Sequence, residues 1–186
     1  MTVSRQRVDT TMSDPIVIRQ LTPSDTAAYR ELRLASLRDF QFAHGPDYEE
    51  ALGKSLAWHA ERLARPDYHW FGAFDADALV GAVCLRAKEG RRLRHVASLN
   101  SLMVGREQQR AGIGRLLTAH LIAFARSLGH IRQLTLVVNE DNAPARRLYD
   151  SLGFQQFGCQ PDAIFHEGRY CATQHLFLSL VSPDPS

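Results

Sequence analysis

Apolar and polar positions alternate with different periods along this chain of 186 residues. The run Ile16–Leu21 is short and rich in β-branched residues, which predicts a strand. Between Ile113 and Leu128, apolar side chains recur every three or four positions, which predicts a helix with one buried face. Leu134–Val138 is almost wholly apolar, as expected of a strand covered on both faces. The chain therefore mixes both kinds of element.

The same pattern predicts about seven strands in the whole chain, interspersed with helices. Strands are expected at 16–21, 95–104, 134–138, 154–158 and 170–180, with a hairpin across 70–87, and helices at 22–39, 48–63, 113–128 and 142–152. This order predicts an α/β fold in which a mixed sheet carries helices on both faces.

Local signals mark several helix ends. Thr22 fits an N-cap, with Pro23 at the first helical position and Asp25 in the first turn. Gly129 and Gly153 fit helix C-termini, because glycine readily adopts the left-handed conformation that closes many helices.

Composition and length fit one globular domain, since 45% of the residues are apolar and 23% are charged. We expect this domain to span 15–181, between a flexible polar leader at 1–14 and a flexible tail at 182–186. Met12 is an alternative start. No apolar run reaches the roughly 20 residues of a membrane helix, and the leader lacks the apolar middle of a secretory signal.

Charge and cysteine usage limit the partners. The net charge of +2 is too near balance to indicate nucleic acid, and the basic run Lys88–His95 lacks the interleaved aromatic residues that stack on bases. Cys84, Cys159 and Cys171 form no CxxC pair and no metal-ligand spacing, so we expect a cytoplasmic protein without a metal. We expect no nucleic-acid or membrane partner, and a homodimer stays open.

Gly112 and Gly114 lie in the segment QQRAGIGRLL (109–118), just before a helical pattern begins. The first turn of a helix presents unpaired backbone N–H groups and roughly half a positive charge. Glycine lets a bulky anion approach the backbone, so a phosphate or pyrophosphate here is physically reasonable. A GxG that only makes a tight turn is the alternative interpretation.

Two common phosphate loops do not fit this segment. A P-loop requires Lys and then Ser or Thr after its last glycine, where this chain has Arg115 and Leu116. A dinucleotide fingerprint requires a third glycine, at the position of Leu117. It also requires its glycines directly after a strand, whereas seven residues separate Val104 from Gly112.

Two segments together resemble the signatures of the GNAT superfamily of N-acetyltransferases. QRAGIG matches the pattern Q/R-x-x-G-x-G/A, and NAPARRLYDSLGF (142–154) matches N-x-x-A-x-x-L-Y-x-x-x-G-F at every named position. The resemblance covers about 16–180 and is closest to small bacterial members. It implies a mostly antiparallel central sheet with one splayed parallel pair of strands.

The resemblance implies acetyl-coenzyme A (acetyl-CoA) as the donor. The pyrophosphate would lie on the backbone of the glycine loop, formed by Gln109, Arg110, Ala111, Gly112, Ile113, Gly114 and Arg115. The pantetheine arm would lie between the parallel strands 95–104 and 134–138, and pair with backbone groups of Leu102, Met103 and Val104 like an added strand. Asn142 and Ala145, from the second signature, are further expected coenzyme contacts, although a plain helix N-cap explains Asn142 equally well.

Tyr149 matches the position of the family's usual general acid. Attack of an amine on the thioester expels a thiolate, and a phenol with a pKa of about 10 can donate a hydrogen bond or a proton to that sulfur. A core aromatic residue on a short helix is the alternative interpretation. No cysteine lies at a motif position, which favours direct transfer in a ternary complex over a covalent relay.

The general base stays unassigned. Several relatives carry a glutamate four residues before the position of Val104, where this chain has Asn100, which cannot accept the proton. The remaining candidates are Glu49, Glu50, His95, His166, Glu167 and a chain of waters.

The resemblance places the acceptor between FQFAHGPDYEE (40–50) and CQPDAIFHEGRY (159–170). A structured hairpin at the second segment tends to close the groove that a peptide needs, so we expect a primary amine of a small molecule or an amino acid. Two alternatives stay open: an enzyme that acetylates proteins or peptides, and a coenzyme-binding sensor without turnover. Asn100 favours the sensor, and Tyr149 counts against it.

Overall fold

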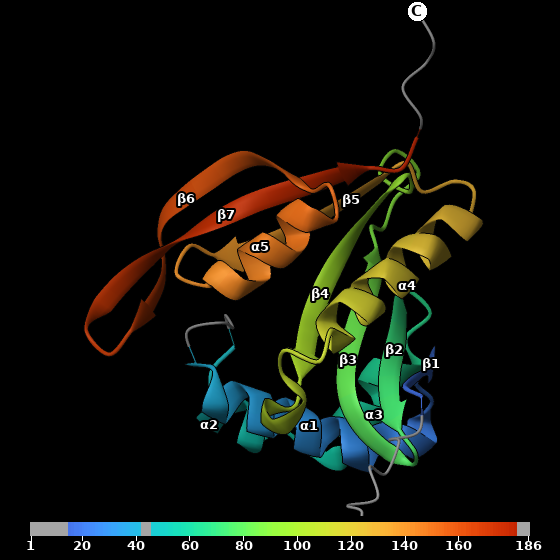
Figure 1. The fold of residues 1–186 in the computed structure, drawn as a ribbon, viewed down its shortest axis with the longest axis vertical. Helices are drawn as coiled ribbons and strands as arrows, with labels where there is room; N and C mark the ends of the chain where they lie inside the picture. The colour runs from blue at the N-terminus through green and yellow to red at the C-terminus, as the bar shows by residue number, and fades with distance from the viewer. Residues whose placement is uncertain (1–14, 42–45, 182–186) are drawn as a thin grey trace, which may run out of the picture.

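The computed structural model of the chain describes residues 15–41 and 46–181, so the predicted leader and tail lie outside the described residues. A seven-stranded sheet forms the centre, with strand order β1-β2-β3-β4-β5-β7-β6 (Figure 1). Neighbouring strands run antiparallel except for the parallel pair β4 and β5. The predicted fold class, a mixed and mostly antiparallel sheet flanked by helices, is therefore confirmed.

The element bounds follow the sequence pattern closely. The strands are β1 (Val17–Gln20), β2 (Tyr68–Asp75), β3 (Ala78–Ala87), β4 (Val96–Val104), β5 (Gln133–Asn139), β6 (Gln155–His166) and β7 (Arg169–Ser179). The helices are α1 (Thr26–Asp39), α2 (Tyr48–Leu52), α3 (Leu56–Ala64), α4 (Ile113–Ser127) and α5 (Ala143–Ser151), with 3-10 turns η1 (Pro23–Asp25) and η3 (Arg106–Gln108).

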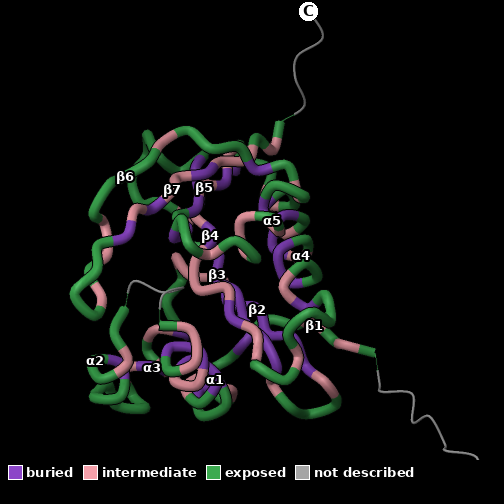
Figure 2. The backbone as a smooth tube through the Cα atoms, turned by 60° about the vertical axis from the view of Figure 1, so that its left-hand side comes forward, coloured by how far each residue is buried: buried purple, intermediate pink, exposed green. Residues whose placement is uncertain are grey.

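Apolar side chains form a core on each face of the sheet. On one face, Leu117 and Leu121 of α4 and Tyr149 of α5 pack over the strands. On the other face, Tyr29 of α1 and Leu63 of α3 pack against β2, β3 and β4. Figure 2 shows that the buried positions follow the central strands, whereas β6 at the sheet edge is largely exposed.

The parallel pair holds only at one end. β4 and β5 pair at three successive positions, from Val96 with Gln133 to Ser98 with Thr135. Beyond them the two described strands diverge, and the half-sheet β5-β7-β6 turns away from β1–β4 (Figure 1). The cause lies partly in β4 itself, where Ser101 has a φ of 53° and the register against β3 shifts, which marks a β-bulge.

Two predicted elements differ in detail. The single helix expected at 48–63 is two helices, because Gly53 ends α2 and the Ser55 hydroxyl accepts a hydrogen bond from the Trp58 N–H at 3.1 Å, which caps α3. The strand expected at 154–158 continues to His166, because β6 absorbs Pro161 in an irregular stretch between Gln160 and Ile164.

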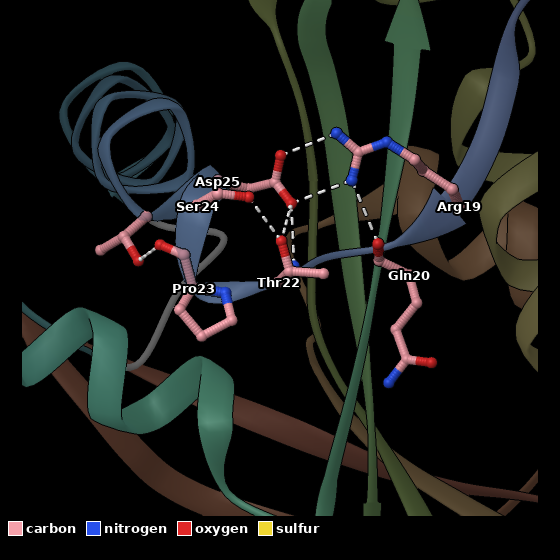
Figure 3. Close-up of polar contacts among 7 residues, drawn as sticks. Arg19, Gln20, Thr22, Pro23, Ser24 and Asp25 are labelled. Atoms are coloured by element: carbon pink, nitrogen blue, oxygen red, sulfur yellow. Dashed lines mark hydrogen bonds and ion pairs between the residues drawn. The ribbon is translucent and has the colours of Figure 1, made fainter.

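Thr22, Pro23 and Asp25 form a separate 3-10 turn before α1 and not the first turn of the helix that their sequence predicts (Figure 3). Pro23 begins the turn η1, and the Asp25 carboxylate accepts hydrogen bonds from the Thr22 N–H at 2.8 Å and from Arg19 at 2.7 and 2.9 Å. Arg19 also lies 3.9 Å from the centre of the Phe74 ring on β2. The turn is thereby fixed to the edge of the sheet.

Cys84, Cys159 and Cys171 are free thiols. Within 15–41 and 46–181, no helix combines the length and apolar character needed to cross a membrane. The same residues contain no group of His, Cys, Asp and Glu side chains arranged to hold a metal ion.

Candidate functional site

The N-terminus of α4 presents backbone donors at the end of the glycine loop. The first main-chain hydrogen bond of the helix runs from the Leu116 N–H to the Gly112 carbonyl, at 3.0 Å. The N–H groups of Ile113, Gly114 and Arg115 precede that bond, so helix geometry gives them no intrahelical acceptor. Together with the helix dipole, these groups make a site for an anion.

Two residues of the loop adopt the left-handed conformation. Gly112 has a φ of 81° and Arg110 a φ of 68°. A Cβ atom on Gly112 would meet nothing within 4 Å, so glycine serves the backbone angle here rather than a tight contact. The N–H groups of Gln109 and Ala111 make long main-chain bonds of 3.4 Å. The chain therefore turns sharply just before α4 begins.

Gly114 brings three elements of the predicted donor site together. A Cβ atom at this position would lie 3.5 Å from the Leu148 side chain on α5. It would also lie 3.8 and 3.9 Å from the side chains of Val104 and Leu102 on β4. The side chain of Arg115, expected near the pyrophosphate, donates a hydrogen bond to the Ser151 hydroxyl at 2.7 Å. Loop, splayed strand and second signature thus converge on one place.

The second signature forms α5, which covers the diverging strands. The Asn142 side chain accepts a hydrogen bond from the Ala145 N–H at 3.1 Å and so caps the helix. The N-cap interpretation of Asn142 is therefore confirmed, while its contact with a coenzyme stays a prediction. Its amide NH2 is the part of the side chain suited to donate to a ligand.

Tyr149 is almost fully buried on α5, with 6% of its surface exposed. Its ring packs edge-on against Phe154, with the ring centres 5.6 Å apart. Burial raises the pKa of the Tyr149 phenol well above its ordinary value. The hydroxyl is consequently protonated at any physiological pH, which is the state that donates.

The position of Asn100 identifies the face of the sheet on which an acceptor would lie. Asn100 pairs with Cys84 of β3, which in turn pairs with Trp70 of β2. Directly opposed residues in neighbouring strands point to the same face, so this row faces α1 and α3. The Asn100 amide donates to the Ser98 carbonyl and hydroxyl at 3.1 and 2.9 Å, which holds it in place.

The base candidates lie in different surroundings. His95 is exposed at the paired end of β4, where its carbonyl accepts from Arg132, far along the strand from the glycine loop. Glu49 and Glu167 are exposed, and Glu50 lies on α2. His166 is half-buried near the end of β6.

The two segments expected to flank the acceptor come together. A cavity lies between Leu37 and Gln41 of the α1 end, Tyr48 of α2 and the β6 residues Ile164–His166. Residues 42–45 of the first segment, Phe42 among them, lie outside the described residues. Of the base candidates, His166 is the one that lines this cavity.

A buried polar cluster that the sequence did not predict lies beneath α1 and α3. Its members are Tyr29, Arg33, His59, Arg62 and Trp70, each with a buried side-chain nitrogen or oxygen that has no hydrogen-bond partner among the described residues. One signal was present in the sequence, because Arg33 lies four residues after Tyr29 and four before Leu37, on the buried face of its helix.

A family model described as "Acetyltransferase (GNAT) family" matches residues 29–154. Among curated proteins, the N-alpha-acetyltransferase RimI of Mycobacterium tuberculosis is 32% identical over 146 residues, which cover 78% of this chain and 82% of that protein.

Solved structures share the fold. A GNAT-family acetyltransferase from Streptococcus pneumoniae has a TM-score of 0.80 at 24% identity, covering 89% of this chain and 99% of that one. A phosphinothricin acetyltransferase from Sinorhizobium meliloti, solved in complex with acetyl-CoA, has a TM-score of 0.75 at 23% identity, covering 88% of each chain.

Proposed function

Because this chain belongs to the GNAT family of acetyltransferases and so transfers acetyl groups from acetyl-CoA to amines, we propose that its acceptor is the primary amine of a small molecule or an amino acid. The observation that carries this proposal is a cavity shared by the β6–β7 hairpin and the helices. It is lined by the hairpin residues Ile164–His166, by Leu37 of α1, by Gln41 just after α1 and by Tyr48 of α2, so the hairpin restricts the room for an extended peptide.

The donor site of this proposal uses the loop and the diverging strands. The N–H groups of Ile113, Gly114 and Arg115 bind the pyrophosphate, because they point out of the helix at its positive end. The pantetheine arm lies along β4 at Leu102–Val104, beyond the last pair that β4 makes with β5 at Ser98. Acetyl-CoA then supplies the activated acyl group, and the protein supplies its orientation.

Tyr149 is the proposed general acid. Its hydroxyl holds a proton because burial disfavours the phenolate, and the departing sulfur of the donor needs that proton or a hydrogen bond. Its place on α5, covering the divergence of β4 and β5, supports this role. The amine loses its proton to His166 or to water, since His166 lines the acceptor cavity.

A second candidate function is acetylation of a protein N-terminus. The observation that favours it is the 32% identity with the mycobacterial N-alpha-acetyltransferase RimI. A non-catalytic sensor is the weaker alternative, because the family assignment and the buried, protonated Tyr149 favour turnover. We also propose a cytoplasmic location, based on three free thiols.

A thiol-release assay at saturating acetyl-CoA tests the acceptor class. We expect kcat/KM for free amino acids and small amines to exceed that for peptides with the same first residue by at least tenfold. N-acetylated copies of the same acceptors serve as blanks. A preference of tenfold for the peptides would establish the second candidate instead. No release with any acceptor, although calorimetry shows acetyl-CoA binding, would establish the sensor.

A further inference from the structure

Two arginine side chains lie in the polar cluster beneath α1 and α3. Arg33 has only 7% of its surface exposed, and Arg62 is half-buried. The Nε atoms of both are buried without a hydrogen-bond partner among the described residues. Neither arginine forms an ion pair with a carboxylate within residues 15–41 and 46–181. Because guanidinium stays charged in proteins, the fold holds two positive charges that it does not neutralise.

Further donors surround these charges. His59 and Tyr29 are fully buried, and both His59 ring nitrogens and the Tyr29 hydroxyl have no partner in the described residues. The Trp70 indole N–H is in the same condition, and the Trp70 and Tyr29 ring centres are 4.9 Å apart. Buried polar groups are almost always hydrogen-bonded, so a concentration of unpaired donors indicates a site for an acceptor-rich ligand.

In the described part of the chain, aromatic rings stabilise the positive charge of only one of the two arginines, Arg62. The Arg62 guanidinium lies 5.4 or 5.5 Å from the ring centres of Trp58, Tyr68 and Trp70, close enough for cation–π attraction. No such ring contact is present for Arg33 among the described residues. Arg33 is therefore the charge that most needs a counter-ion.

The arginines open onto a cavity of about 200 Å³. Arg33, Arg62 and Lys54 supply three positive charges to its lining, and Trp58 supplies an apolar wall. Asp47 and Glu50 also line it. One Asp47 carboxylate oxygen already accepts from the N–H groups of Glu49 and Glu50, at 2.8 and 3.1 Å. With three basic and two acidic side chains, the lining carries one more positive than negative group.

The cavity lies on the acceptor side of the sheet. Pro46 and Asp47 line both it and the cavity that contains His166. Trp70, which belongs to the cluster, is in the same row as Asn100 and two strands away, a separation of about 10 Å at ordinary strand spacing. A group bound by the arginines would therefore lie on the same face of the sheet as Asn100.

We propose that Arg33 and Arg62 bind the carboxylate of the acceptor, so that the substrates are amines that also carry an acidic group. This rests on the proposed small-molecule acceptor and narrows it. Guanidinium groups suit this task, because their planar N–H forks match the two oxygens of a carboxylate.

The anion site is tested without any turnover. Sodium succinate should raise the melting temperature of the wild-type protein, measured against sodium chloride of equal ionic strength. The variant Arg33→Met should lose this rise. Its own melting temperature in chloride should equal or exceed that of the wild type, because an unpaired buried charge has been removed. The matched control is Arg65→Met, which loses an exposed arginine paired with Asp67 at the α3 end and should keep the succinate effect.

The acceptor class is tested by thiol release with amino acids and their amides. In the wild type and in Arg65→Met, kcat/KM should be at least tenfold higher for the acid than for the amide. In Arg33→Met this ratio should fall below twofold. Equal rates for acid and amide in an active wild type would overturn the inference and leave the proposed function standing. Absence of the succinate effect in the wild type would also overturn it. Loss of that effect in Arg33→Met would support the anion site even if no amine were acetylated, which separates the two failures.

Discussion

The proposed role of Tyr149 as general acid depends on its buried place on α5. We expect Tyr149→Phe to lower kcat at least tenfold, about 1.4 kcal/mol in the barrier, because the leaving sulfur loses its proton donor. Acetyl-CoA affinity should hardly change, since the ring still packs against Phe154. Steady-state kinetics and calorimetry measure the two effects. Tyr68→Phe removes a hydroxyl at the far end of β2 and should alter neither; unchanged kcat in Tyr149→Phe would remove its catalytic role.

Arg110 occupies a backbone conformation that disfavours any residue with a Cβ atom. Its φ of 68° costs an L-residue roughly 1–2 kcal/mol relative to glycine. The greater conformational entropy of glycine in the unfolded chain offsets part of this gain in stability. Arg110→Gly should therefore raise the free energy of unfolding by about 0.5–1 kcal/mol, measured by urea denaturation. A loss of stability would show that the arginine side chain makes contacts that outweigh the strain.

Residues in short contiguous motifs were predictable from the sequence, and residues gathered from separate elements were not. Tyr149 and Asn142 share one signature, so their spacing fixed their relation before any fold was known. The cluster around Arg33 draws on α1, α3 and β2. Only tertiary packing brings His59 within 5.9 Å of Tyr29, measured between ring centres. Single residues of this kind look like ordinary surface positions in a sequence.

At the scale of elements, the proposed binding of pyrophosphate at the start of α4 requires that a ligand can reach the backbone N–H groups there. Gly112→Asp should weaken acetyl-CoA binding at least tenfold by calorimetry, because the added carboxylate repels a pyrophosphate and the φ of 81° becomes strained. Gly90→Asp is a matched control, since Gly90 has a φ of 97° and open space around its Cα, but lies in the β3–β4 connection. It should be destabilised similarly and bind normally. Equal affinities in both variants would place the coenzyme elsewhere.

The start of α1 makes the stability of the fold depend on pH. The Arg19 guanidinium holds the pKa of Asp25 far below its ordinary value. A depressed pKa means that Asp25 stabilises the fold fully above its unfolded pKa of about 4, and that this contribution is lost as the pH falls below it. Asp25→Asn should cost about 1 kcal/mol at pH 7.

The difference between wild type and Asp25→Asn should shrink as urea denaturation is repeated from pH 5 down to pH 2. Asp77→Asn, in the β2–β3 turn, is the control and should show no such convergence. A constant difference between wild type and Asp25→Asn over this range would contradict the depressed pKa.

Element types followed from periodicity, and some element ends did not. The apolar pattern of 48–63 is continuous enough for one helix, so the break rests on two weak local signals, Gly53 and Ser55. The length of β6 was hidden because Pro161 discourages a strand. β6 continues beyond Pro161 because it pairs with β7 as far as His166 with Arg169. Pairing between distant segments decided what local preference left open.

At the scale of the whole molecule, the β6–β7 hairpin and the helices line the two sides of the proposed acceptor cavity. Phe165 pairs with Tyr170, and His166 pairs with Arg169. Deleting these four residues leaves the turn Glu167–Gly168 joined to the pair Ile164 and Cys171. In the thiol-release assay we expect the ratio of kcat/KM for peptides to that for small amines to rise at least tenfold, because loss of His166 affects both acceptors and only the peptide gains room. A shortened hairpin with unchanged selectivity would show that other residues exclude peptides.

Because β4 and β5 pair at only three positions, the sheet consists of two parts, β1–β4 and β5–β7, joined over a short length. A donor bound in the opening beyond those pairs would hydrogen-bond to β4 and contact both parts of the sheet. The two sides of the proposed amine pocket belong to different parts of the sheet. The pocket would therefore reach its final shape only after the donor is bound. The expected consequence is an ordered cycle in which the nucleotide thiol enters first and leaves last, so that free coenzyme A competes with the donor and not with the amine.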